Sequence, residues 1–199
     1  MSQPAPAGYS SIMTSRTPLD ALFAGYLRDL VQIAELARVQ RERENRAANS
    51  LVGKLALEAV RLSAYERAFL LPVAAEVLDD GPAVVDREVA RLDRLEELVG
   101  GLEALDMATG GPALDAVADY AAELASDQRH GLLPRLAQAL PAGDLVELGA
   151  RVTPTQEPGS THSHPKLTGG HDVTTWPGVG MLHSLREAFA TEISLRQAV

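Results

Sequence analysis

The sequence predicts an all-α fold: an up-down-up-down four-helix bundle made from a duplicated helical hairpin, with an extended tail and an extra C-terminal amphipathic helix. Apolar residues make up 46 % of the 199 residues but aromatic residues only 4 %, and alanine and leucine dominate where β-branched residues would mark strands. Apolar positions recur every three or four residues over long stretches, which is the helical period. The pattern also repeats after 62 residues.

The first helix is predicted from Thr17 to about Gln40. Thr17 is a favoured N-cap residue, and Pro18 suits the first helical position because its missing amide hydrogen is not needed there. One apolar stripe follows, which favours burial of a single helix face. Its members are Leu19, Leu22, Phe23, Tyr26, Leu30, Ile33 and Ala37.

The second helix is predicted over residues 50–78 and has two irregular features. Pro72 predicts a kink or break near residues 68–72, because proline lacks an amide donor and clashes with the preceding turn. Glu66 interrupts an otherwise apolar face, so one carboxyl group is expected among the core residues.

The second half of the chain predicts three more helices. The third spans residues 83–106, and the fourth spans 112–140 with Pro134 as its break. A short helix over 144–150 follows. Together with the first two helices, these complete a compact helical unit.

The domain organisation follows from composition. Residues 1–16 are predicted to be a disordered N-terminal segment, and residues 17–151 the bundle. Residues 152–178 are rich in Pro, Gly, Thr and His without periodicity, which predicts an extended segment. Residues 179–199 form a last amphipathic helix, whose apolar face should dock on the bundle or on a partner. Trp176 is expected to anchor the returning tail on the bundle, with partner binding as the alternative.

The 62-residue repeat places specific residues together. Two equal hairpins related by a pseudo-twofold axis pack most simply as a four-helix bundle, in which four leucines would meet near one level. Glu66 and Gln128 each follow one of those leucines by four residues and should point into the same layer. The matched pairs are Leu30 with Leu92, Leu62 with Leu124, Glu66 with Gln128, Arg67 with Arg129, Leu70-Leu71-Pro72 with Leu132-Leu133-Pro134, and Gly81 with Gly143.

In the second and fourth helices, a polar residue follows the layer leucine by four residues and a proline follows it by ten. This spacing, in a bundle of two hairpins, resembles the hemerythrin-like (HHE cation-binding) family over about residues 17–165. In that family, the second and fourth helices read His-x-x-x-Glu before an apolar-proline ending, and the first and third helices each supply a histidine. These ligands bind a non-haem di-iron centre used for oxygen binding or sensing. The family's trailing segment is echoed by Thr153-Pro154-Thr155 and His164-Pro165.

The resemblance implies a vacated di-iron site. Of the six ligand positions, only Glu66 keeps the family residue, and leucine has no lone pair to offer a metal. We therefore expect no metal, no cofactor and no enzymatic activity. The family ligand positions correspond to Leu30, Leu62, Glu66, Leu92, Leu124 and Gln128.

Several interpretations of these residues stay open. Glu66 is a structural partner of Gln128, an exposed group at the bundle rim, a remnant metal ligand or a general acid or base. The leucine layer is a filled core or an apolar pocket for a ligand such as a fatty acyl chain. The histidines at 162, 164, 171 and 183 match no metal-ligand spacing, so a tail without metal is expected, with residual iron or haem binding by Glu66 and tail histidines as the alternative.

Composition narrows the function classes. The net charge of -9 opposes binding to nucleic acid or anionic membranes, and the absence of cysteine excludes disulfides, thiolate zinc sites, iron–sulfur clusters and cysteine nucleophiles. No apolar stretch approaches the roughly 18 residues of a membrane span, and a cytoplasmic location is expected. The expected function is a scaffold, regulatory or protein-interaction module that self-associates through the last helix or an exposed hairpin face. The alternative is a binder of a small apolar ligand in the vacated site.

Overall fold

The structure, a computed structural model, describes residues 17–42, 47–103, 105, 110–153 and 181–197. Within these ranges the chain is helical and contains no strand, which confirms the all-α prediction for this part of the protein. The elements are α1 (Leu19–Glu42), α2 (Ala47–Tyr65), the π-helical turn η1 (Glu66–Leu70), α3 (Leu71–Val77), α4 (Gly81–Glu103), α5 (Gly111–His130), α6 (Leu132–Ala139), α7 (Ala142–Val152) and α8 (Met181–Gln197).

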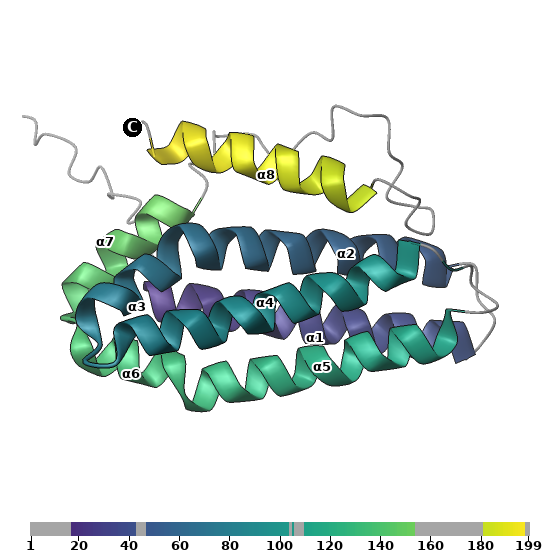
Figure 1. The fold of residues 1–199 in the computed structure, drawn as a ribbon, viewed down its shortest axis with the longest axis horizontal. Helices are drawn as coiled ribbons and strands as arrows, with labels where there is room; N and C mark the ends of the chain where they lie inside the picture. Colours follow the sequence, from purple (N-terminus) through teal and green to yellow (C-terminus); the bar gives the residue numbers. More distant parts are fainter. Residues whose placement is uncertain (1–16, 43–46, 104, 106–109, 154–180, 198–199) are drawn as a thin grey trace, which may run out of the picture.

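Four long helices lie side by side along the long axis of the molecule (Figure 1). Helix α1 packs against α2 and α5, and α4 packs against α5 and α2, so each long helix contacts two of the others. Helices α3, α6 and α7 gather at one end, and α8 lies outside the long helices against α2 (Figure 1). Leucine and alanine side chains from α1, α2, α4 and α5 fill the core, as their periodicity predicted.

Both prolines inside helical stretches interrupt the helix ahead of them. Before Pro72, the α-helix gives way to the π-helical turn η1, so the α-helix is interrupted where a kink or break was predicted. In the second half the break is not at Pro134, as the sequence suggested, but three residues earlier at Gly131. Pro134 has no N–H to donate one turn back, so the hydrogen bond is lost there, and glycine tolerates the resulting bend.

The duplication is visible in how the two short helices end. Leu78 and Leu140, which are 62 residues apart, both leave the helix in extended conformation, with ψ of 137° and 142°. Their amides donate to the carbonyl oxygens of Ala74 and Leu136, at 3.2 and 3.1 Å. The sequence repeat therefore corresponds to a repeat of local backbone geometry.

Helix α8 docks on its own chain. Leu182, Leu185 and Phe189, the buried apolar residues of α8, belong to the same core as the long helices. The ring of Phe189 meets that of Tyr65 edge-on at 6.0 Å, and the Tyr65 hydroxyl donates to Glu192 Oε1 at 2.9 Å. Of the two expected docking partners for this apolar face, the structure places it on its own chain, against α2. A second protein would have to contact another surface.

Some expectations fall on residues outside the described ranges. These are the segment 1–16, the predicted extended segment from residue 154 to 178, the histidines at 162, 164 and 171 within it, and Trp176. His183 is described: it is exposed on α8 and lies 3.2 Å from Glu187. None of the described helices combines the length and apolar character needed to cross a membrane.

Candidate functional site

Leucines occupy the interior at the four positions where the resemblance implies histidine ligands. Each comes from a different long helix, and each is buried. They belong to the continuous apolar core and do not line the surface groove described below. Their exposed fractions are 0 % for Leu30, 0 % for Leu62, 0 % for Leu92 and 2 % for Leu124.

A cluster of three buried polar side chains lies within this core. Glu66 at the start of η1 and Gln128 near the end of α5 are fully buried, and Glu88 of α4 is 1 % exposed. The Gln128 Nε2 group donates to Glu66 Oε2 at 2.8 Å and to Glu88 Oε2 at 3.3 Å. One amide therefore joins two carboxyl groups from different helices. The interpretation of Glu66 as an exposed group at the bundle rim is wrong, because the side chain is fully buried.

The two carboxyl groups have different electrostatic surroundings. Glu88 Oε1 accepts hydrogen bonds from Arg91 Nη1 at 3.0 Å and Arg87 Nε at 3.3 Å, so guanidinium groups balance its charge. Among the described residues, no guanidinium group forms an ion pair with Glu66. Burial raises the pKa of Glu66 to about 8; the Gln128 hydrogen bond opposes that rise, the nearby Glu88 charge adds to it, and Arg67 lowers it.

Two oxygen atoms of the cluster lack a hydrogen-bond partner among the described residues: Glu66 Oε1 and Gln128 Oε1. Unpaired buried acceptors are uncommon and costly, because they have lost their hydrogen bonds to water. These two atoms belong to the pair of side chains that are already hydrogen-bonded to each other.

The donor set does not suit a di-iron centre. The described residues contain no group of three or more His, Cys, Asp or Glu side chains placed to hold a metal ion. Glu88 is engaged by guanidinium groups, and the four leucines offer no ligand atom. General acid or base catalysis by Glu66 also lacks support, because a fully buried carboxyl group is out of reach of a substrate.

Sequence reasoning found Glu66 and Gln128 but missed Glu88. A usable signal was present: Glu88 precedes Leu92 by four residues, which is the spacing by which Glu66 follows Leu62 and Gln128 follows Leu124. The sequence therefore allowed the prediction that Glu88 shares a helix face with Leu92. Its arginine partners were harder to predict, because α4 carries several arginines.

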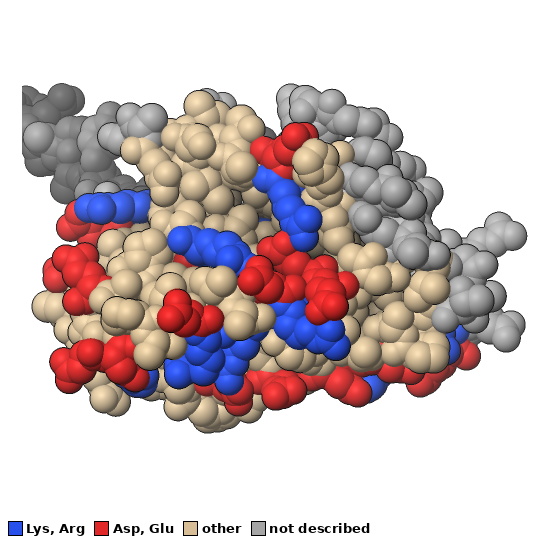
Figure 2. All heavy atoms as spheres, in the orientation of Figure 1, with Lys and Arg blue, Asp and Glu red and all other residues tan. Residues whose placement is uncertain are grey.

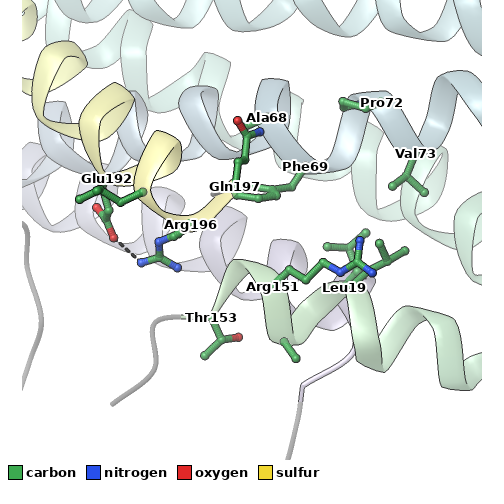
Figure 3. A pocket seen from close by; sticks show the side chains of 13 residues that line it. Leu19, Ala68, Phe69, Pro72, Val73, Arg151, Thr153, Glu192, Arg196 and Gln197 are labelled. Carbon is green, nitrogen blue, oxygen red and sulfur yellow. Dashed lines mark hydrogen bonds and ion pairs between the residues drawn. The ribbon is translucent and has the colours of Figure 1, made fainter. Parts of the chain in front are cut away.

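A surface groove of about 900 Å³ lies where η1, α3, α7 and α8 meet (Figure 3). Arg196 forms an ion pair with Glu192 on one side, and Arg151 pairs with Glu147 at 2.8 Å on another. Leu195 of α8 also lines the groove and is 68 % exposed, the largest exposure among the large hydrophobic residues described. The apolar lining includes Leu19, Phe69, Pro72, Val73, Leu148 and Leu195.

The charged surface formed by η1, α4 and α8 is mixed in sign. Arg67 contacts Asp93 at 2.7 Å, and Arg186 of α8 contacts Glu96 of α4 at 2.5 Å. Figure 2 shows basic and acidic side chains next to each other across the face in view. These pairs connect helices and leave this face without a patch of one charge.

Comparison with known proteins identifies no relative. No family model, curated protein or solved structure matches the chain. The function proposed below therefore rests on the interior residues and the surface groove.

Proposed function

We propose that this chain is a metal-free protein of the hemerythrin-like type, a four-helix bundle that acts without catalysis as a scaffold or regulatory interaction module. The observation that carries this proposal is the burial of leucine at all four positions where the resemblance implies imidazole ligands. A core filled by aliphatic side chains supports stability and offers neither a redox centre nor access for a substrate.

The contact between Glu66 and Gln128 supports the duplicated-bundle arrangement. These residues are 62 positions apart, so they are equivalent in the two hairpins, and they are hydrogen-bonded at 2.8 Å. Two equivalent residues related by a twofold axis touch only where the axis passes between them. The pairwise packing of α1, α2, α4 and α5 is what such a bundle requires.

Metal analysis tests the first part of the proposal. Protein purified without chelator, and then incubated with ferrous iron under anaerobic conditions and desalted, is expected to retain iron far below one ion per chain. Its absorption spectrum should lack visible bands. A Glu66→Ala variant serves as the control and should give the same trace level. A di-iron stoichiometry that this variant abolishes would contradict the proposal.

For the interaction surface, we propose the groove between α3, α7 and α8, with a second copy of this chain as its occupant. Leu195 is exposed to solvent beside an apolar groove of its own molecule. Other apolar residues of α8, such as Phe189, are already buried in the core. In a twofold pair, each copy can insert its exposed leucine at the groove of the other, so one patch supplies both contacts. Burial of Leu195 would then remove this exposed apolar surface from water.

A charged residue at Leu195 tests this surface. Leu195→Asp is expected to weaken self-association at least about tenfold, because a carboxylate would be desolvated in the apolar contact. Light scattering coupled to size exclusion over a concentration series would measure this. The control is Leu36→Asp: Leu36 is 50 % exposed on α1, about 25 Å along the helix from Leu19 in the groove, and should leave association unchanged. A wild-type protein that is monomeric at all concentrations would contradict the second-copy proposal.

Binding of a small apolar molecule is the second candidate function, and the groove favours it more than the interior does. Glu66 and Gln128, the expected polar anchors for an interior ligand, are hydrogen-bonded to each other. The leucines at the other four family ligand positions are buried in the core. Native mass spectrometry of the purified chain would detect a retained small molecule and distinguish this function from pairing of two copies.

A further inference from the structure

The orientation of the Gln128 amide is determined by its neighbours. Its Nε2 group faces two carboxyl oxygens, Glu66 Oε2 and Glu88 Oε2. The reversed orientation would place the amide oxygen against Glu88, whose carboxylate is paired with two arginines and offers no hydrogen. The two N–H groups of Gln128 are therefore used, and its Oε1 atom is the one left without a partner.

One hydrogen atom would satisfy both unpaired oxygens. Glu66 Oε1 and Gln128 Oε1 are the unpaired oxygens of a carboxyl group and an amide group. These two groups are already joined by the 2.8 Å hydrogen bond from Gln128 Nε2 to Glu66 Oε2. A neutral carboxylic acid and an amide can form a ring with two hydrogen bonds, in which the amide N–H donates to one carboxyl oxygen and the acid O–H donates to the amide oxygen. In its ionised form the carboxyl group has no hydrogen to donate, and both oxygens stay unpaired.

The surroundings assign this proton to Glu66 rather than Glu88. Arg87 and Arg91 of α4 contact Glu88 and favour its charged form. Glu66 faces Gln128 of α5 and Glu88 of α4. Arg67, the next residue in η1, directs its guanidinium to Ser63 and Asp93 instead.

We propose that Glu66 is a buried proton-binding site, at which a single proton closes an acid–amide pair with Gln128 and makes the side-chain link between η1 and α5 depend on pH. Loss of the proton places two carboxylates, Glu66 and Glu88, on one amide inside the core. Because Glu66 is the first residue of the π-helical turn η1, that turn is where deprotonation would loosen the fold. This proposal does not depend on the proposed function.

The direction of the pH effect follows from the pKa of Glu66, which burial raises from 4.5 to about 8. The folded protein binds this proton more tightly than the unfolded chain does. The resulting stability is complete below pH 4.5, decreases as the pH rises, and is lost above about pH 8.

A carbon NMR titration of the full chain, labelled at the glutamate carboxyl carbons, tests the proposal directly. The signal that disappears in Glu66→Gln, but persists in the exposed control Glu97→Gln, belongs to Glu66. We expect this signal to titrate with a midpoint near pH 8. A Glu66 carboxyl group that is already ionised at pH 6 would overturn the proposal, as would a metal ion bound to the pair in wild-type protein.

Urea unfolding at pH 5 and pH 9 supplies an independent readout. The equilibrium constant for unfolding of the wild-type protein should rise by on the order of a hundredfold to a thousandfold from this group between the two values. Glu66→Gln should lack this rise, because the new amide donates to Gln128 Oε1 at both pH values, whereas Glu97→Gln should behave as wild type. An equal pH dependence in Glu66→Gln and wild type would contradict the proposal.

Discussion

Replacement of Gln128 by leucine is expected to lower the free energy of unfolding by about 3 kcal/mol at neutral pH. The leucine fills a similar volume but removes the N–H groups that serve Glu66 and Glu88. Glu66 then has no hydrogen-bond partner for either oxygen, and Glu88 retains only its arginine contacts. The loss should be large because both carboxyl groups are buried and cannot recover hydrogen bonds from water.

Urea unfolding followed by circular dichroism would measure this effect. The matched control is Gln138→Leu on α6, since Gln138 is exposed and the same substitution there should change stability by less than about 0.5 kcal/mol. A Gln128→Leu protein as stable as wild type would show that the hydrogen bonds from Gln128 to Glu66 and Glu88 do not stabilise the fold.

The second large effect is expected for Phe189→Ala, which should cost about 4 kcal/mol in the free energy of unfolding. Phe189 is fully buried, and its ring packs edge-on against Tyr65. Its removal leaves a cavity between α8 and the long helices and takes away the central apolar contact of α8. Because a separate helix of this length is marginal in water, α8 should detach and lose helicity.

Limited proteolysis together with thermal unfolding would detect this change. In Phe189→Ala, cleavage within α8 should become fast while the helices from α1 to α7 stay protected. The control Glu187→Ala removes an exposed side chain from the same helix and should leave both readouts near wild type. Equal protection of α8 in Phe189→Ala and wild type would mean that the apolar face of α8 does not hold the helix in place.

The cluster shows how much of an interior site can be predicted from a repeat. The sequence placed Glu66 and Gln128 in one layer, because each follows a leucine of that layer by four residues and positions four residues apart share a helix face. The structure has them hydrogen-bonded at 2.8 Å. Glu88 was missed although it precedes Leu92 by four residues. Its hydrogen bond to Gln128 depends on the rotation of α4 relative to α5, which no local pattern specifies.

The sequence by itself determined the all-helical class, the approximate bounds of the helices, the interruption of the α-helix before Pro72 and the burial of leucine at the expected ligand positions. Each depends on residues close together in the chain, whose periodicity and backbone chemistry act locally. Only the tertiary structure decided that α8 covers α2, that Glu88 joins the buried pair and that a groove forms beside Leu195. These features come from contacts between distant segments, whose relative placement is set by how whole helix faces pack together.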